Sequence, residues 1–453
     1  MRDYPPPPLF AETTGRMSAD ALRELQNTRF LARVTEAWGV PFYRKRWRAA
    51  GIEPGDIRSL DDIARLPSFT SDDLKAAGEA APPFGSHHPF GREGLGTMPL
   101  KLQTSGGTTG KPRVTLFDPI AWEVQGIQAA RALYAQGARP GDVIQLTYTN
   151  SLANAAWCAS TGIFHWLGCV PVTAGSGIVT SSEKHLEFAR DFGTNGWFAR
   201  GEYLSRLAEV ARETGFDLHD LKTKFMHSYI GADDEGHLRK RLQKAWNAPL
   251  YDNYGSHETG PIAFECAAQD RKHISEDTVF VEVADVDTLQ PVPAGTPGTL
   301  ILTSLHRSVP PFIRYNIRDM MALFEREQCG CGLCTRKLSG FLGRADEMVK
   351  LRGTNVYPMA CQTAILRDDR GTGEFICVVE YRGDGLSRRE HMTVRVERTS
   401  RSVDAKAFAA DLERAYRRDL GVRVDVEIVD PGSLAEPTRF ATGKARRLMD
   451  LRK

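Results

Sequence analysis

Strand and helix patterns alternate directly after a glycine-rich segment, and this alternation limits the chain to few fold classes. Residues 113–117 (RVTLF) predict a strand, residues 118–137 predict a helix, and residues 142–150 (DVIQLTYTN) predict the next strand. Asp118 suits the N-cap of the helix and Pro119 its first turn. Alternation of this kind is typical of α/β folds, so we expect one here.

The pattern changes near residue 343. Strand patterns at 375–383 and 392–400 precede an amphipathic helix at 404–421, which Gly421 ends, and a further strand at 422–430. This order predicts a small α+β domain. Because 453 residues are many for one core, we expect two domains, residues 1–343 and 344–453.

The first 95 residues predict helices, including residues 22–39 and residues 71–80 with Ser71 as N-cap, and they indicate little chemistry. The net charge of +2 leaves no basic excess for binding a nucleic acid. Neither a signal peptide nor a membrane span is visible in the sequence. We therefore expect a cytoplasmic protein that binds neither nucleic acid nor membrane, with the oligomeric state open, a homodimer included.

The glycine-rich segment QTSGGTTGKP, residues 103–112, differs from a Walker A loop. Ser105 stands where the first glycine of that motif belongs, and Pro112 replaces the magnesium-binding hydroxyl. The hydroxyls and main-chain amides of the segment can still surround phosphates, with Lys111 supplying charge. An isolated segment of this composition is more often an ordinary polar turn.

Four further motifs follow in order: YGSHETG (254–260), IRYNIRD (313–319), GRADEMVKLRG (343–353) and ATGKARR (441–447). Together with TSGGTTGKP they resemble the core motifs of the adenylate-forming superfamily, and RYNIRD, LRGTNVYP and TGKARRLMDLRK most resemble phenylacetate–coenzyme A ligases and related aryl-acid ligases. The resemblance implies a large adenylate-forming domain and a small, mobile α+β C-terminal domain that carries a catalytic lysine.

The resemblance also implies a two-step reaction. A carboxylate first attacks the α-phosphate of ATP and releases pyrophosphate, and the thiol of coenzyme A then displaces AMP. The implied cofactors are ATP, Mg²⁺, coenzyme A and a structural Zn²⁺. The implied nucleotide-binding residues are Thr104, Ser105, Gly106, Gly107, Thr108, Thr109, Gly110, Lys111, Tyr254, Gly255, Asp319 and Arg344.

Four residues have expected roles in catalysis or in domain movement: Lys444, Glu258, His257 and Asp346. By resemblance Lys444 bridges carboxylate and phosphate oxygens, Glu258 binds Mg²⁺, and Asp346 is the hinge of the small domain. The simpler alternative for Asp346 is a salt-bridge partner. His257 stands where the family places Thr or Ser, whose hydroxyl contacts the α-phosphate. Its imidazole can donate that hydrogen bond, or bring a positive charge if protonated. Alternatively, His257 is a local variant without functional effect.

Cysteines gather in CGCGLC at residues 329–334, and Cys266 and His273 lie upstream in ECAAQDRKH. Four such ligands from two loops suit a tetrahedral Zn²⁺ site, and the cytosol disfavours disulfides. The likeness to aryl-acid ligases implies the ligands Cys266, His273, Cys329 and Cys331, whereas a four-cysteine site with Cys334 in place of His273 remains open. The other cysteines sit among apolar residues and are expected in the core: Cys158, Cys169, Cys361 and Cys377.

The acyl pocket is expected at residues 146–162 and 228–234, with Tyr148, Asn154, Trp157 and Ala232 as substrate-binding candidates. An aromatic lining suits a flat acid of the benzoate, hydroxybenzoate, aminobenzoate or phenylacetate type, although such side chains are more often simple packing. The alternatives are an adenylating enzyme that delivers the acyl group to a carrier protein or amine, a silent nucleotide-binding relative, and, less favoured, a zinc-ribbon module.

Overall fold

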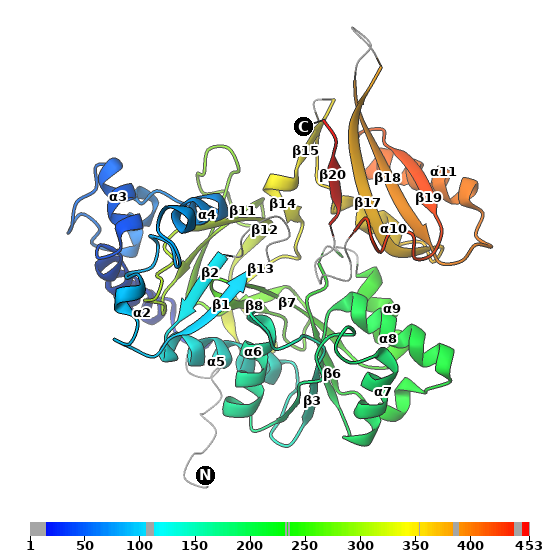
Figure 1. Ribbon diagram of the computed structural model, residues 1–453, viewed down its shortest axis with the longest axis horizontal. Coiled ribbons are helices and arrows are strands. Elements are labelled where there is room, and N and C mark those ends of the chain that lie inside the picture. Colours follow the sequence, from blue (N-terminus) through cyan, green and yellow to red (C-terminus); the bar gives the residue numbers. More distant parts are fainter. Residues whose placement is uncertain are drawn as a thin grey trace. The chain divides into compact units, whose positions relative to one another are not determined.

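The computed structural model describes residues 15–105, 113–231, 233, 236–352, 354–383, 389–438 and 446–452. The chain divides into two compact units (Figure 1). The larger comprises Met1–Ile230, Leu242–Ile317 and Ala322–Ser339, and the smaller comprises Gly231–Arg241, Arg318–Met321 and Gly340–Lys453. The predicted mixed α/β architecture is confirmed, and the domain boundary after residue 343 stays a prediction.

Short helices at the start of the larger unit cover one end of its sheet. They are α2 (Ala19–Ala37), α3 (Pro41–Ala49), the 3₁₀ turn η1 (Leu60–Arg65), α4 (Ser71–Ala80) and the 3₁₀ turn η2 (Arg92–Gly94). Phe30 of α2, Trp47 of α3 and Phe69, which lies between η1 and α4, are buried in one cluster with Phe312 and Tyr315. The burial of these large aromatic groups stabilises a segment that has few strands of its own.

The predicted N-cap of α4 was wrong by one residue. Thr70 is the N-cap, and Ser71 is the first residue of the helix. The main-chain N–H of Thr70 donates to Asp73 Oδ2 at 2.8 Å, which completes a capping box. Thr70 is the N-cap because Asp73 lies three residues after it, which is the spacing that a capping box requires.

One half of the main sheet is parallel, an arrangement typical of chains in which strands and helices alternate. Its order is β4 (Val170–Val172), β3 (Val143–Leu146), β5 (Gly196–Phe198), β6 (Phe225–Ser228) and β7 (Leu250–Ser256). The connecting helices are α5 (Pro119–Ala135), α6 (Ala155–Thr161) with the π-helix η3 (Gly162–Trp166), α7 (Ser182–Asp191), α8 (Gly201–Thr214), η4 (Leu218–Leu221) and α9 (His237–Trp246). Asp118 caps α5 and Pro119 begins it, as predicted.

The other half of the main sheet is largely antiparallel. It continues from β7 through β8 (Gly260–Phe264), β9 (Lys272–Ile274), β13 (Cys334–Leu338), β12 (Tyr315–Gln328), β11 (Pro297–Ser304) and β10 (Val279–Ala284). Strand β7 pairs parallel with β6 on one side and antiparallel with β8 on the other. The turn from β7 to β8, residues 256–260, therefore lies where the two halves of the sheet meet.

The smaller unit confirms the predicted α+β pattern. Its four-stranded sheet has the order β19 (Asp425–Val429), β18 (Arg389–Arg398), β17 (Gly371–Arg382) and β20 (Leu448–Asp450). Helices α10 (Ala360–Leu366) and α11 (Ala405–Asp419) bury Phe408, Leu412 and Tyr416 against this sheet. The hairpin of β15 (Val349–Leu351) and β16 (Thr354–Val356), strand β14 (Gly343–Arg344) and the turn η5 (Ala345–Glu347) complete the unit. No helix in the described ranges is long and apolar enough to cross a bilayer.

Candidate functional site

The glycine-rich segment joins the two strands of a short hairpin. β1 (Lys101–Ser105) pairs antiparallel with β2 (Arg113–Phe117), and Ser105 lies opposite Arg113 at the neck of the loop. The Arg113 Nε donates to Ser105 Oγ at 3.2 Å, and the Thr104 N–H donates to the Leu152 carbonyl at 2.8 Å. Six of the predicted phosphate-binding residues lie outside the described residues: Gly106, Gly107, Thr108, Thr109, Gly110 and Lys111.

The turn from β7 to β8 carries the YGSHETG motif. Tyr254 lies near the end of β7 and is buried, with 7% of its surface exposed. Ser256 closes the turn because its Oγ accepts from the Thr259 N–H at 3.1 Å and lies 2.9 Å from Thr259 Oγ1. A Cβ on Gly255 would stand 2.9 Å from the Gly260 carbonyl oxygen, so this close turn requires glycine at 255.

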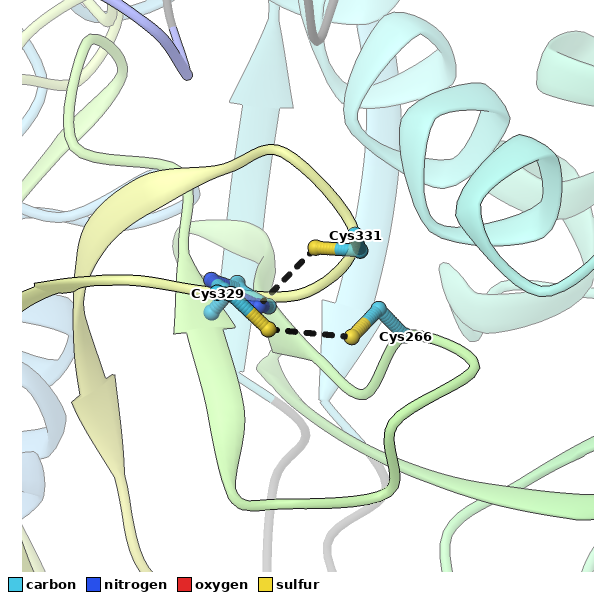
Figure 2. A group of neighbouring side chains, drawn as sticks. Cys266, Cys329 and Cys331 are labelled. Atoms are coloured by element: carbon cyan, nitrogen blue, oxygen red, sulfur yellow. Dashed lines mark hydrogen bonds between the residues drawn. The ribbon is translucent and has the colours of Figure 1, made fainter.

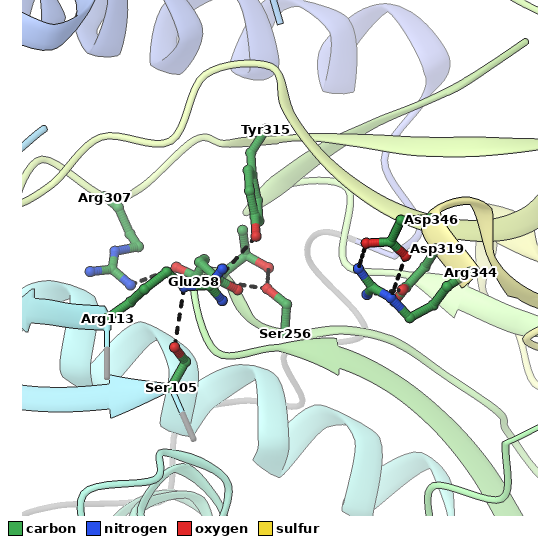
Figure 3. A network of polar contacts seen from close by, with 10 residues as sticks. Ser105, Arg113, Ser256, Glu258, Arg307, Tyr315, Asp319, Arg344 and Asp346 are labelled. Atoms are coloured by element: carbon green, nitrogen blue, oxygen red, sulfur yellow. Dashed lines mark hydrogen bonds and ion pairs between the residues drawn. The ribbon is translucent and has the colours of Figure 1, made fainter. Parts of the chain in front are cut away.

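Glu258 projects from this turn into a buried cluster (Figure 3). Its Oε1 lies 3.0 Å from Arg113 Nη2 and accepts from the Tyr315 hydroxyl at 3.4 Å. Burial by itself raises the pKa of the Glu258 carboxyl, but the Arg113 guanidinium, together with a hydrogen bond from Ser256, holds that pKa below its usual value. The site thus presents a buried carboxylate that is ionised at neutral pH beside the neck of the glycine-rich loop.

Arg307 fixes the main chain around Glu258. This fully buried guanidinium donates to the carbonyls of Glu258 and Leu116, each at 2.6 Å, and of Val309 at 3.1 Å. Its charge also lies 3.9 Å from the Phe117 ring centroid. Arg307 therefore joins the base of the glycine-rich hairpin to the turn that carries Glu258.

His257 lies next to Glu258 in the chain and is partly buried, and its Nε2 atom is buried and unpartnered among the described residues. Burial lowers the pKa of this imidazole to about 4, and the positive charges of Arg307 and Arg113 act in the same direction. The ring is consequently neutral at physiological pH and keeps one nitrogen available for a hydrogen bond.

The smaller unit gathers three of the predicted residues into an ion-pair group, also drawn in Figure 3. Arg344 Nη1 lies 2.8 Å from Asp319 Oδ1, and its Nε and Nη2 donate to the two oxygens of Asp346 at 2.8 and 2.7 Å. Burial lowers the pKa of Arg344, but the hydrogen bonds to Asp346 outweigh it and raise that pKa. Asp346 is thus a salt-bridge partner of Arg344. Lys444 lies outside the described residues.

Three of the substrate-binding candidates lie on α6 or in the segment before it: Tyr148, Asn154 and Trp157. The ring of Tyr148 meets Phe198 edge to face at 5.4 Å between centroids, and Trp157 lies 6.3 Å from Trp122. The Asn154 amide donates to Gln125 Oε1 at 2.5 Å, while its own Oδ1 is buried and unpartnered in the described part of the chain. Ala232 lies outside the described residues.

The four residues predicted as zinc ligands come together in the larger unit (Figure 2). One atom from each of Cys266, His273, Cys329 and Cys331 lies within 4.8 Å of the others. Cys266 follows β8, His273 lies on β9, and Cys329 and Cys331 form the turn from β12 to β13. Cys334, the alternative ligand, is not part of this group.

The distances in the cluster fit a tetrahedral metal ion. The Sγ atoms of Cys266 and Cys329 are 3.8 Å apart, and Cys331 Sγ lies 3.5 Å from His273 Nε2. Zinc bond lengths place two sulfurs about 3.8 Å apart, and a sulfur and a nitrogen about 3.6 Å apart, in a tetrahedron. His273 Nδ1 lies 2.8 Å from Thr335 Oγ1, a contact of the kind that orients a metal-binding imidazole.

The surroundings of one cluster thiol favour its ionised form. Hydrogen bonds from Cys266 and from His273 lower the pKa of the Cys331 thiol. Because thiolates are the form that binds zinc, the donor set is suited to this metal.

Sequence reasoning missed Arg113, Arg307 and Tyr315, which surround Glu258. Arg113 directly follows the glycine-rich loop and Tyr315 lies within IRYNIRD, so their positions in the motifs are a usable signal. Arg307 has no comparable motif, and its contacts reach 191 residues back to Leu116.

Comparisons with known proteins give consistent results. Residues 353–452 match the family model of the AMP-binding enzyme C-terminal domain. The chain is 30% identical to a phenylacetate–coenzyme A ligase of Thermus thermophilus, over 98% of each chain. It is 29% identical to the enzyme of the same name from Aromatoleum evansii, over 99% of this chain and 98% of the other. The crystal structure of a 2-hydroxyisobutyryl-CoA ligase in the postadenylation state superposes with a TM-score of 0.85 at 26% identity, covering 99% of this chain and 94% of that one.

Proposed function

Because the chain belongs to the adenylate-forming superfamily and to its family of phenylacetate–coenzyme A ligases, we propose that it is an AMP-forming acid–CoA ligase. In the first step a carboxylate oxygen of the acid bonds to the α-phosphorus of ATP, and pyrophosphate leaves. In the second step the sulfur of coenzyme A bonds to the acyl carbon, the bond to AMP breaks, and the thiol proton is lost. The observation that most supports this proposal is the buried, ionised Glu258 beside the neck of the glycine-rich loop.

Glu258 is the proposed ligand of Mg²⁺. A single protein carboxylate suits this ion, which usually completes its shell with water and substrate phosphates. When bound, Mg²⁺ would neutralise phosphate charge as pyrophosphate leaves. Tyr315 and Arg307 keep Glu258 in place, one by a hydrogen bond to the carboxylate and the other by a hydrogen bond to its main chain.

The phosphates are assigned to Thr104, Ser105, the loop residues 106–111 and His257. We infer that His257 acts as a neutral hydrogen-bonding group and not as a cation, because the pKa of its buried imidazole lies at about 4. Its unpartnered Nε2 supports a contact with a bound polar group. Lys444 supplies the positive charge that stabilises the developing transition state at the α-phosphate.

Tyr254 and Asp319 are assigned to the nucleoside. Tyr254 offers a flat face to adenine, with Gly255 beside it leaving room for the close turn, and Asp319 offers two acceptor oxygens to the ribose hydroxyls. Arg344 is held between Asp319 and Asp346 and orients the former. Asp346 is the proposed hinge, since a change in its backbone dihedral angles would rotate the residues that follow it.

The proposed substrate class is an aromatic carboxylic acid. The edge-to-face pair Tyr148–Phe198 and the tilted pair Trp122–Trp157 support a pocket that favours a flat ring. The unpartnered Asn154 Oδ1 supports an additional hydrogen bond to a substrate group. One relative is named for phenylacetate and one structural neighbour for 2-hydroxyisobutyrate, so the test must include both kinds of acid.

The cysteine–histidine cluster is the proposed site of a structural Zn²⁺. Four protein ligands leave no open position for a water or substrate, which is the pattern of structural zinc sites. Cys266, His273, Cys329 and Cys331 would hold the ion and connect the loop after β8 with the turn between β12 and β13.

The experiment that tests the assignment is product analysis. Purified protein is incubated with Mg·ATP, coenzyme A and each of benzoate, hydroxybenzoate, aminobenzoate, phenylacetate and 2-hydroxyisobutyrate, and the products are identified by mass spectrometry. The proposal predicts AMP and the CoA thioester of an aromatic acid. An acyl-adenylate without thioester would instead assign the acyl group to a carrier protein or an amine.

A further inference from the structure

Arg113 makes two contacts that the proposed reaction does not explain. Its Nη2 lies 3.0 Å from Glu258 Oε1, and its Nε donates to Ser105 Oγ at 3.2 Å. Ser105 and Arg113 are the residues on either side of the loop at 106–112. One side chain therefore links the neck of the glycine-rich loop to the carboxylate that is the proposed metal ligand (Figure 3).

The two partners of this ion pair differ in burial. The Glu258 side chain is 5% exposed, whereas that of Arg113 is 29% exposed. A buried carboxylate requires a compensating charge, and Arg113 is the only cation that forms an ion pair with Glu258 in the part of the chain that the structure describes. The guanidinium stands on the open side of the pair and can leave without being extracted from the core.

Arg307 provides a contrast within the same cluster. It is fully buried, and its hydrogen bonds to the described residues go to main-chain carbonyls and not to the Glu258 carboxylate. Arg307 is thus held by the fold, while Arg113 is held mainly by the carboxylate and by one hydroxyl. Of the two guanidinium groups, Arg113 is the one that can be exchanged for another cation.

The ion pair and a metal ion compete for one oxygen. Mg²⁺ binds carboxylate oxygens at about 2.0 to 2.1 Å, so a guanidinium 3.0 Å from Oε1 would stand next to a doubly charged ion. We propose that Arg113 is a displaceable counter-ion of Glu258, which occupies the carboxylate until a divalent cation arrives with the nucleotide. This inference rests on the proposed function, because it takes Glu258 as the metal ligand.

The proposal implies that Arg113 suppresses binding of the free metal. A cation that arrives alone must break the ion pair and leave two positive charges near each other. A cation that arrives with ATP brings phosphates whose negative charge compensates the released guanidinium. The protein would therefore take up metal as a metal–nucleotide complex in preference to the free ion.

The test measures Mn²⁺ binding to the nucleotide-free protein at pH 8, from the electron paramagnetic resonance signal of unbound Mn²⁺. The variants are Arg113→Gln, Arg113→Lys and the double variant Arg113→Gln/Glu258→Gln, with thermal unfolding as the check of folding. Arg336→Gln is the matched control, since Arg336 also pairs with a buried carboxylate, that of Glu276, at 2.7 Å. Manganese is a hard ion and avoids the cysteine cluster.

We expect Mn²⁺ to bind Arg113→Gln about tenfold to a hundredfold more tightly than the unaltered protein. This factor corresponds to the free energy of one hydrogen bond to a charged group. The gain should vanish in the double variant and be absent from Arg336→Gln. Arg113→Lys should fall between, because lysine keeps the charge but lacks the planar guanidinium that contacts both Glu258 and Ser105.

Equal affinity of the unaltered protein and Arg113→Gln would overturn the proposal, as would an equal gain in Arg336→Gln. If Arg113→Gln does not fold, the Mn²⁺ affinity of Arg113→Lys is compared with that of the unaltered protein instead. Equal affinities would then contradict the proposal. Because the titration contains no ATP or acid, it is independent of turnover. Failure of the proposed function would appear separately, as absent CoA thioester in the unaltered protein.

Discussion

Replacing Cys266 by serine should remove zinc and weaken the larger unit. Cys266 and Cys329 are 63 residues apart in sequence, and a link that closes a loop of this length restricts the unfolded chain by about 4 kcal/mol. Strands β9 and β13 already pair at His273 and Lys337, so part of this loop is closed without metal. We therefore expect a loss of about 2 to 4 kcal/mol.

The expected loss converts into a measurable change in melting temperature. For a unit of roughly 300 residues, an unfolding entropy of about 2 cal/mol/K per residue gives a decrease of roughly 3 to 6 °C. The assays are metal analysis of the purified proteins by mass spectrometry and thermal unfolding by differential scanning fluorimetry, with and without a chelator.

Cys169→Ser is the matched control, because Cys169 is buried and lies outside the cluster. It should keep one zinc per chain, whereas Cys266→Ser should lose it. The reasoning is refuted if the unaltered protein contains no zinc after purification in zinc-containing medium, or if Cys266→Ser melts at the same temperature as Cys169→Ser.

Three further predictions concern the reaction and the pH dependence. Lys444→Ala should lower pyrophosphate exchange by about 10²-fold to 10³-fold while calorimetry still detects ATP binding, and unchanged exchange would contradict its role. Asp346→Ala should change the ratio of the two half-reactions, measured as acyl-adenylate and thioester formation in single turnovers; equal effects on both would argue against a hinge. Thermal stability should fall as the pH drops from about 6.5 towards 4. Burial lowers the pKa of several histidines in the folded state, so the unfolded chain binds more protons in this range. A constant melting temperature between pH 7 and 5 would contradict this prediction. The histidines concerned are His87, His185 and His257, with pKa values of about 4, and His227 and His306, with pKa values of about 3.

Local signals in the sequence were sufficient for much of the fold. Asp118 and Pro119 mark the start of α5, and Gly421, with a φ of 67°, follows the end of α11, because caps and stops depend on neighbouring residues. The strand expected at 142–150 is shorter, since β3 ends at Leu146 and TYTN continues as a loop. Sequence patterns do not define where the pairing partner of a strand stops.

The site was predictable where its residues belong to motifs. The crowding of Cys329, Cys331 and Cys334 indicated a metal, but spacing alone left the ligand set open, and the structure groups the two first cysteines with Cys266 and His273. Arg113 and Glu258 are 145 residues apart in the sequence, so no local pattern could predict their pairing. Contacts of this kind depend on how β2 and the turn after β7 are brought together by the sheet.

The most direct test of the account is isotopic pyrophosphate exchange by the purified protein with Mg·ATP across a panel of aromatic and short aliphatic acids. We expect exchange that requires an aromatic acid and is lost in Lys444→Ala. Absence of exchange with every acid, in a protein that binds ATP, would contradict the proposed adenylation and favour a silent nucleotide-binding relative.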